Sequence, residues 1–271
     1  MGIIIDGRKI SEKILSELVE KRKKIDKELK LVSITSEDES AQTYANMIGK
    51  KCKILDINFD RIFANNEERI LSAIENLNKD KDVQGIIVSF PLPKGASILN
   101  VFSAIDYNKD VEALSVFSIG NIFYNKKILP STPSAVIKIL EELNFKFEGA
   151  NIAIINHSIV IGKPLAIMLL NRNATVRVCH IYTKNLKENV RNSDVLIVGC
   201  GKPNLINKEF VNKDMIVIDC GMNRIGNLLT GDVDFENVKD VVRAITPVPG
   251  GVGPVNVAIL LRNFIELVSN R

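Results

Sequence analysis

The proline- and glycine-rich segment from Ile245 to Pro254 is the part of the sequence best suited to contact a ligand. It reads Ile-Thr-Pro-Val-Pro-Gly-Gly-Val-Gly-Pro, so proline fixes the backbone in places and glycine allows positive φ elsewhere. A helix is expected directly after it, and the amides at a helix N-terminus favour anionic or carbonyl groups. The alternative interpretation is a tight turn that only ends a strand.

A second candidate, Asn156 to Pro164, lies between an expected strand and an expected helix. Its position suits a cofactor pyrophosphate over the helix N-terminus, with Pro164 starting the helix. The pattern is weak by itself, because it holds one glycine where the usual dinucleotide fingerprint has three. The next expected strand ends in Cys179-His180-Ile181-Tyr182, without the acidic residue that typically binds a ribose hydroxyl.

Polar residues in the first half of the chain form a third candidate: Tyr44 on an amphipathic helix, Ser89 at a strand end, and the acids Asp110 and Glu112. We expect the strand ends at Ser89 and at Asp110 to Glu112 to be the spatial neighbours of Tyr44. The alternative is that the tyrosine is half-buried packing and the acids are solvated loop residues. None of these segments identifies a reaction alone.

The elements that must position these residues alternate between strand and helix. Leu29–Thr35 is an expected strand, and the continuous apolar run Val83–Phe90 is typical of a strand buried on both faces. Ser40 is the expected N-cap of the helix that carries Tyr44. The alternation predicts an α/β fold with a Rossmann-type, doubly wound nucleotide-binding domain and an N-terminal α/β catalytic domain. We expect the catalytic domain at 1–120, completed by a C-terminal helix at about 253–271, and the nucleotide-binding domain at 121–252.

Composition excludes several other classes of protein. A net charge of +4 over 271 residues is mild, and the basic stretch Lys21 to Lys30 lacks interleaved aromatic residues, so we expect no nucleic-acid partner. No signal peptide and no membrane-spanning window are recognised, and the four cysteines are scattered. These features predict a cytoplasmic protein. The two histidines have no ligand spacing, so no metal site is expected.

Taken together and in order, the motifs resemble one family, the bifunctional methylenetetrahydrofolate dehydrogenase/cyclohydrolases. Pro249 to Pro254 matches its Pro-Gly-Gly-Val-Gly-Pro signature, and further matches run through the whole chain. They include Ile4-Ile5-Asp6-Gly7, Val83-Gln84-Gly85-Ile86, Pro91-Leu92-Pro93, Lys109-Asp110-Val111, Gly162-Lys163-Pro164, Gly201-Lys202-Pro203, Asp219-Cys220-Gly221-Met222 and Gly231-Asp232-Val233-Asp234.

The resemblance implies a homodimer of two-domain chains with a cleft, a folate or related pterin substrate on the N-terminal side, and NADP or NAD on the Rossmann side. Hydride transfer from the folate methylene carbon to the nicotinamide is mainly a matter of geometry. By position, the implied cofactor contacts are Asn156, His157, Ser158, Ile161, Gly162, Lys163, Pro164, Ile181, Cys200, Gly201, Met222, Gly250, Gly251 and Val252. The implied substrate contacts are Tyr44, Pro91, Pro247, Pro249, Gly250, Gly253 and Pro254, and the implied catalytic residues are Tyr44, Ser89, Asp110 and Glu112.

Three departures from the family pattern concern the second activity. The family lysine four residues after the tyrosine is Ile48 here, the glutamine before Leu-Pro-Leu-Pro is Ser89, and the second aspartate of Lys-Asp-Val-Asp is Glu112. The lysine is associated with cyclohydrolase chemistry, and an isoleucine cannot shuttle a proton. The hypothesis is that hydride transfer survives while cyclohydrolase activity is lost or greatly weakened. The alternative is that a distortion at Gly49 brings Lys50 to the face of Tyr44.

The choice of cofactor stays open between NAD and NADP. Family members that use NADP tend to present an arginine and a small hydroxyl residue to the 2′-phosphate, and the corresponding residues here are His157 and Ile181. This slightly favours NAD, or an unusual NADP contact through Lys184 or a nearby arginine. Two further functional alternatives are an enzyme for a different pterin carrier and a non-catalytic relative that binds folate or nucleotide.

Overall fold

The computed structural model describes residues 2–124, 127–226 and 228–269, and the chain divides into two compact units. Unit 1 contains Met1–Ser11 and Thr132–Asn256, and unit 2 contains Glu12–Ser131 and Val257–Arg271. This division differs from the expected domain limits at the start of the chain, because β1 (Ile3–Ile4) pairs in parallel with β11 (Ala244–Ile245). It also differs by about a dozen residues at the expected boundary after 120.

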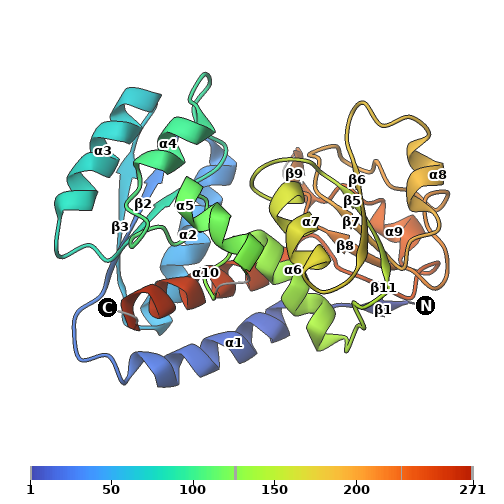
Figure 1. Cartoon of the computed structure of the whole chain (residues 1–271), viewed down its shortest axis with the longest axis horizontal. Coiled ribbons are helices and arrows are strands. Elements are labelled where there is room, and N and C mark those ends of the chain that lie inside the picture. Colours follow the sequence, from blue (N-terminus) through green and yellow to red (C-terminus); the bar gives the residue numbers. More distant parts are fainter. Residues whose placement is uncertain (1, 125–126, 227, 270–271) are drawn as a thin grey trace. The chain divides into compact units, whose positions relative to one another are not determined.

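Unit 1 is built on a parallel sheet of six strands in the order β1-β11-β8-β7-β5-β6. The inner strands β7 (Val195–Val198) and β8 (Ile216–Asp219) are buried at every residue, as apolar runs in a covered sheet must be. Beside them lie β5 (Asn151–Ile155) and β6 (Thr175–Cys179) (Figure 1). Because β6 and β7 flank β5 on opposite sides, the strand order reverses there, which confirms the predicted doubly wound, Rossmann-type fold.

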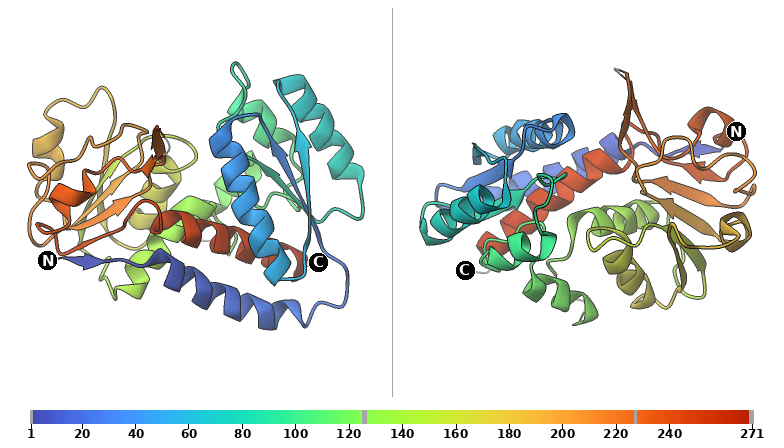
Figure 2. Two further views of the ribbon diagram at one scale, coloured as in Figure 1. Left: turned by 180° about the vertical axis from the view of Figure 1, so that it is seen from behind. Right: turned by 90° about the horizontal axis from the view of Figure 1, so that it is seen from above.

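Helices connect the strands of unit 1, and their apolar faces complete its core. The bounds are α6 (Ser131–Glu142), α7 (Gly162–Leu170), α8 (Leu186–Val190) and α9 (Phe235–Val238). Val190 and Val238 are fully buried against the strands. An antiparallel hairpin, β9 (Asn223–Ile225) and β10 (Leu228–Thr230), was not predicted, and Figure 2 shows it as a narrow orange ribbon that projects from this unit.

Unit 2 is built on a three-stranded parallel sheet in the order β3-β2-β4. The strands are β2 (Lys30–Thr35), β3 (Asn58–Phe63) and the fully buried β4 (Gly85–Val88). An isolated parallel bridge pairs Ile86 with Asp110, so the segment leading to Glu112 runs beside β4. The helices of this part of the chain are α1 (Gly7–Arg22), α2 (Glu39–Ile54), α3 (Glu67–Lys79), α4 (Ile98–Ala104), α5 (Val116–Gly120) and the 3₁₀ helix η1 (Asn121–Tyr124).

Helix α2 carries Tyr44 and begins earlier than expected. Its N-cap is Asp38 rather than Ser40, because the Asp38 carboxylate accepts hydrogen bonds from the amides of Ser40 (2.8 Å) and Ala41 (3.2 Å). Aspartate at the N-cap also places a negative charge at the positive end of the helix dipole. The prediction of the helix was therefore correct, and that of its cap was wrong.

The last helix, α10 (Val252–Ser269), supplies much of the core of unit 2 through residues beyond Asn256. Phe264 is fully buried, and a Cβ at Gly85 would lie 2.7 Å from its ring. Lys21 on α1 pairs with Glu266 at 2.5 Å, and the two helices lie side by side (Figures 1 and 2). By length and composition alone α10 could cross a membrane, although the sequence pattern did not indicate this. However, 61% of the helix is buried inside the protein, as in the core helix of a soluble protein.

Candidate active site

Glu112 joins the candidate residues of unit 2 into one hydrogen-bond network. Its Oε1 accepts a hydrogen bond from the Tyr44 hydroxyl (3.0 Å), and its Oε2 accepts one from the Ser131 hydroxyl (2.5 Å). Burial raises the pKa of Glu112 to about 7, although the bonds from Ser131 and Tyr44 lower it, and the charge of Asp110 raises it further. The carboxyl group can therefore hold or release a proton near neutral pH beside a tyrosine hydroxyl.

Asp110 and Ser89 have other partners. The Asp110 carboxylate, which is 1% exposed, accepts hydrogen bonds from the amides of Leu114 (3.3 Å) and Ser115 (2.8 Å). It therefore shapes the loop that follows Glu112. The hydroxyl of Ser89 lies 3.1 Å from that of Ser33 on the adjacent strand β2. The structure thus joins Tyr44 directly to Glu112, whereas Asp110 orders the backbone and Ser89 pairs with a residue that the sequence did not suggest.

Ile48 is fully buried and lies one helical turn after Tyr44. Lys50 is exposed, and α2 is continuous from Glu39 to Ile54, so the distortion at Gly49 that would redirect Lys50 is absent from this helix. A Cβ at Gly49 would lie 2.8 Å from the ring of Phe59, which shows that this glycine allows close packing of α2 on β3. The residue one turn after Tyr44 on α2 is thus a buried isoleucine.

Lys109 is a buried cation whose role the sequence did not reveal. Its ammonium donates hydrogen bonds to the carbonyl oxygens of Leu77 (2.7 Å), Asn78 (2.9 Å) and Asp80 (2.6 Å) at the C-terminus of α3. The last carbonyls of a helix have no partner within the helix and favour a positive charge. Lys109 therefore fixes the approach to Asp110 and Glu112 by capping α3.

In unit 1, the side chain of Asn156 links the loops that follow β5 and β7. Its Oδ1 accepts hydrogen bonds from the amide and hydroxyl of Ser158 (both 2.8 Å) and from the amide of Gly162 (2.9 Å), while its Nδ2 donates to the carbonyl of Gly199. These loops leave the carboxyl ends of the strands where the strand order reverses. Open α/β sheets bind their ligands at this position, so the residues present fit a dinucleotide.

Gly162, the one glycine of the segment from Asn156 to Pro164, allows a close approach of two backbone segments. A Cβ at this position would lie 1.9 Å from the carbonyl oxygen of Asn156, so only glycine allows α7 to begin this close to the preceding loop. The amide of Lys163 donates to the carbonyl of Ser158 (3.0 Å), and Pro164 follows in the first turn of α7. The amides of this turn and the Ser158 hydroxyl are thus largely used within the protein, which leaves the helix dipole and the exposed Lys163 side chain for a phosphate.

Asp232 organises the loop after β7, and sequence reasoning had noted it only as part of a motif. Its carboxylate accepts hydrogen bonds from the amides of Cys200 (2.5 Å), Gly201 (3.0 Å) and Lys202 (2.8 Å). Burial raises the pKa of the Cys200 thiol to about 11, and the nearby Asp232 charge adds to this shift, so the thiol stays protonated at neutral pH. The predicted residues Cys200 and Gly201 are therefore held in place by a carboxylate.

Asp219 forms a second anchor at the end of β8. It accepts hydrogen bonds from the amides of Gly221 (2.8 Å), Asp232 (3.1 Å) and Val233 (2.9 Å). Burial raises the pKa of Asp219 to about 6 despite these three bonds. Met222 follows this anchor and is 45% exposed, so its side chain is available for contact.

The Pro-Gly loop packs against the beginning of α1. The amide of Gly7 donates to the carbonyl of Gly250 (2.9 Å), and a Cβ at Gly7 would lie 1.8 Å from the carbonyl oxygen of Gly251. Gly250 has φ +113°, which strongly favours glycine. Helix α10 begins at Val252, so the loop does lead into a helix as expected. The glycine of the Ile-Ile-Asp-Gly motif near the start of the chain is thus explained by this close approach.

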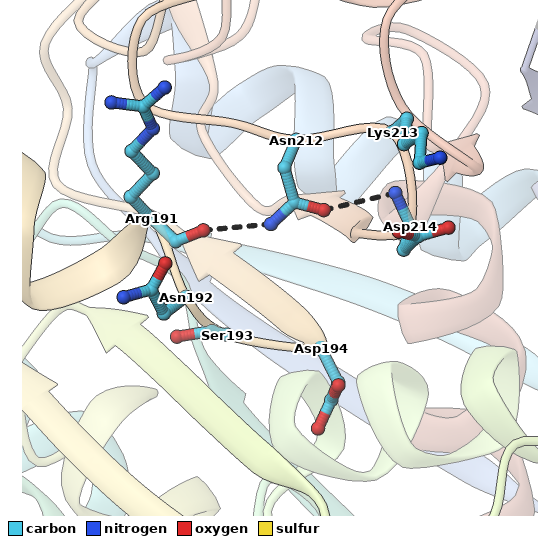
Figure 3. Close-up of a pocket in the computed structure, with 7 residues that line it drawn as sticks. All are labelled: Arg191, Asn192, Ser193, Asp194, Asn212, Lys213 and Asp214. Atoms are coloured by element: carbon cyan, nitrogen blue, oxygen red, sulfur yellow. Dashed lines mark hydrogen bonds between the residues drawn. The ribbon is translucent and has the colours of Figure 1, made fainter.

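A pocket lies at the amino ends of strands β7 and β8 in the sheet of unit 1 (Figure 3). It is lined by Arg191–Asp194 and Asn212–Asp214, which precede β7 and β8. The side chain of Asn212 donates a hydrogen bond to the Arg191 carbonyl (2.7 Å) and accepts one from the Asp214 amide (2.9 Å). Ligands of open α/β sheets bind at the carboxyl ends of the strands, so this pocket is not part of the candidate site. Among residues 2–124, 127–226 and 228–269, no group of three His, Cys, Asp or Glu could hold a metal ion.

The fold and this site define the class as a dinucleotide-binding α/β protein with a second α/β unit that carries a hydrogen-bonded Tyr–Glu pair. The model of the tetrahydrofolate dehydrogenase/cyclohydrolase NAD(P)-binding domain matches residues 130–271, and that of the catalytic domain of the same family matches residues 5–112. The chain belongs to the tetrahydrofolate dehydrogenase/cyclohydrolase family.

Individual relatives agree with this assignment over almost their whole length. The chain is 38% identical to the bifunctional protein FolD of a Nitratiruptor species, over 99% of this chain and 98% of the relative. The crystal structure of the bifunctional FolD of Campylobacter jejuni has a TM-score of 0.93 at 37% identity and full coverage of both chains. A FolD structure from Trypanosoma brucei, complexed with NADP cofactor and inhibitor, has a TM-score of 0.93 at 29% identity, with 99% and 98% coverage.

Proposed function

We propose that this chain oxidises 5,10-methylenetetrahydrofolate to 5,10-methenyltetrahydrofolate with NAD or NADP. The observation that carries the proposal is the Asn156 link between the loops after β5 and β7, in a chain of this family. When bound, the nicotinamide ring accepts a hydride from the methylene carbon of the folate. The protein's own task is to hold the two reacting carbons in place and to exclude water.

The cofactor contacts are proposed at the carboxyl ends of β5 to β8 in unit 1. Asn156, Ser158 and Gly162 shape the first loop, and Asp232 holds Cys200 and Gly201 in the second. The helix dipole of α7 and the charge of Lys163 support binding of the pyrophosphate. The remaining proposed contacts are His157, Ile161, Pro164, Ile181, Met222, Gly250, Gly251 and Val252.

The folate contacts are proposed around Tyr44 and Glu112 in unit 2. A carboxylate that accepts one hydrogen bond at each oxygen keeps further lone pairs for the N–H groups of a pterin ring. Because the pKa of Glu112 is about 7, the same group can instead donate a hydrogen bond when it is protonated. Ser89 and Asp110 are proposed as further catalytic residues, and Pro91 as a further substrate contact in this unit. The substrate contacts proposed in the Pro-Gly loop of unit 1 are Pro247, Pro249, Gly250, Gly253 and Pro254.

The second activity, cyclohydrolysis of the methenyl product, is proposed to be lost or greatly weakened. In that reaction a water oxygen bonds to the methenyl carbon, one carbon–nitrogen bond of the ring breaks, and a proton leaves. Ile48 is buried and cannot carry that proton, and Lys50 lies exposed on another part of α2. The bifunctional relatives favour the alternative, an enzyme with both activities, in which Tyr44 and Glu112 would have to move the proton instead.

A single assay tests both proposals. The pure protein receives methylenetetrahydrofolate with NAD or NADP, and the reduced cofactor and the methenyl product are followed separately. We expect reduced cofactor to form and the methenyl species to accumulate. Prompt loss of the methenyl species at the rate of bifunctional relatives would overturn the loss of cyclohydrolase activity. If neither cofactor is reduced, the dehydrogenase proposal fails, which leaves a different pterin carrier or a non-catalytic binding protein.

Substitution at position 48 sharpens the test. Ile48→Lys restores the family residue one turn from Tyr44, and Ile48→Met adds comparable length without charge. We expect methenyl hydrolysis to rise in the lysine variant only. If both variants stay inactive in hydrolysis but fold and reduce the cofactor, Ile48 is not the cause of the loss.

The assembly and location of the protein are also proposed from its family. We expect a homodimer in the cytoplasm, with no nucleic-acid or membrane partner. Sedimentation equilibrium at micromolar concentration would give twice the chain mass of 30.1 kDa. A single-chain mass under those conditions would contradict the dimer.

A further inference from the structure

The carboxyl ends of β5 and β6 have an unusual set of side chains for a dinucleotide site. In Rossmann-type folds the residues after the second strand meet the adenosine ribose, where an acid binds the free 2′-hydroxyl and an arginine binds a 2′-phosphate. Here β5 and β6 are those two strands, and Ile155 pairs with Cys179 at their ends. The segment that follows β6, His180 to Thr183, contains neither an acid nor an arginine.

The two histidines of the chain meet at this place. His157 follows β5 and His180 follows β6, and their ring centroids are 5.1 Å apart. The Nδ1 of His180 accepts a hydrogen bond from the amide of Tyr182 (3.2 Å), and the His180 amide donates to the Thr183 hydroxyl (2.8 Å). A ring that accepts at Nδ1 carries its hydrogen at Nε2 and therefore offers a single N–H donor. One such donor suits a hydroxyl group.

Charge at this place is poorly suited to a phosphate dianion. Arg177 lies on β6, but its guanidinium donates to the carbonyl of Asn189 in α8, away from the strand end. Lys163 and Lys184 are point charges without the two-pronged geometry by which arginine binds phosphate. The side chain that follows His180 is Ile181, which is 83% exposed and offers no polar group.

We infer that the surface formed by His157, His180 and Ile181 selects the unphosphorylated ribose, so that this chain uses NAD in preference to NADP. The inference rests on the proposed dehydrogenase function. An imidazole N–H contacts a ribose hydroxyl, and the exposed residues Ile181 and Tyr182 border it without a fixed positive charge. A 2′-phosphate would lie there without a two-pronged cationic partner, and a site that leaves a charge unpaired discriminates against it.

The first test is binding, measured without turnover. Calorimetry at pH 8 compares ADP-ribose with its 2′-phosphorylated form, and kcat/KM for NAD and NADP is measured in parallel. We expect the unphosphorylated ligand to bind about tenfold or more tightly, with the same order in kcat/KM. Equal or tighter binding of the 2′-phosphorylated ligand overturns the inference. If neither ligand binds, the proposed function fails instead.

A charge-matched pair of variants tests the position. Ile181→Arg adds a two-pronged donor at the surface defined above, and Ile225→Arg adds the same charge at an exposed isoleucine on the hairpin strand β9. We expect Ile181→Arg to strengthen binding of 2′-phospho-ADP-ribose about tenfold and to leave ADP-ribose nearly unchanged. The control should leave both affinities as they are. An equal shift in the two variants means that general charge, not this surface, sets the preference, and it overturns the inference.

Discussion

The buried carboxyl group of Glu112 in unit 2 is held differently from those of two buried aspartates in unit 1. In unit 1, Asp219 and Asp232 each accept hydrogen bonds from three backbone amides. In unit 2, Glu112 accepts its two hydrogen bonds from the hydroxyls of Tyr44 and Ser131. An amide can only donate and is fixed by the backbone, whereas a hydroxyl rotates and can donate or accept. The aspartates therefore fix loops, and Glu112 can change its protonation state while its partners adjust.

The largest expected effect comes from removing an amide-bound carboxylate. Asp232→Ala leaves the amides of Cys200, Gly201 and Lys202 without their acceptor, and should lower the free energy of unfolding by on the order of 4 kcal/mol. Urea unfolding followed by circular dichroism measures this loss. Asp232→Asn is the control, because it keeps one acceptor oxygen and should lose less. Wild-type stability in the alanine variant would show that these bonds do not anchor the loop.

The next effect is the pH dependence that Glu112 confers on stability. Its pKa in the folded protein, about 7, is raised above the ordinary value of 4.5, so its contribution is greatest below pH 4.5 and is lost as pH rises towards 7. Relative to Glu112→Gln, the wild type should lose on the order of 3 kcal/mol over that range.

The measurement is the difference in urea midpoint between wild type and Glu112→Gln from pH 5 to pH 8. Asp219, whose pKa is raised to about 6, has the same sign of pH dependence. It is present in both proteins, so its contribution cancels in the difference. A difference that does not change with pH would mean that Glu112 titrates as an ordinary surface acid.

A smaller effect is expected from one hydroxyl partner of Glu112. Ser131→Ala removes the bond to Oε2, which should cost about 1–2 kcal/mol at pH 8 and raise the pKa of Glu112 further, because that bond lowers it. The pH range over which Glu112 changes the stability should therefore shift to higher pH. Ser134→Ala, a buried serine on the same helix, should leave this pH range in place. An unshifted pH range in Ser131→Ala would contradict the network.

The smallest effect is expected at the neutral hydroxyl pair. Ser89→Ala removes the bond to Ser33 and should cost about 0.5–1 kcal/mol with no change in the pH dependence. In a double-mutant cycle with Ser33→Ala the losses should not add, because the two hydroxyls are partners. Additive losses would indicate that each serine has a different partner.

The inner strands of the fold could be predicted because their residues are buried on both faces. Val195–Val198 and the first three residues of Ile216–Asp219 are continuous apolar runs, and such runs identify inner strands of a parallel sheet from the sequence alone. The hairpin of Asn223–Ile225 and Leu228–Thr230 could not be recognised in this way, because its short strands are largely exposed and carry no continuous apolar run.

The site was predictable in its residue types but not in its contacts. Tyr44 and Glu112 are 68 residues apart, so only the tertiary structure reveals that they share a hydrogen bond. Ser131 and Lys109 were missed, because a helix-starting serine and a motif lysine have many ordinary roles. Asp219 and Asp232 stood inside recognised motifs, but their purpose became visible only when their backbone partners were known.

Helix α10 has a consequence for how the chain is made. The residues of α10 beyond Asn256 belong to the core of unit 2, whose other residues, Glu12–Ser131, are synthesised first. A ribosome releases the chain from its N-terminus, so the earlier part of unit 2 leaves it before Phe264 exists to pack against Gly85. Unit 2 is therefore completed only after α10 has left the ribosome, and until then its apolar sheet lacks the cover that this helix provides.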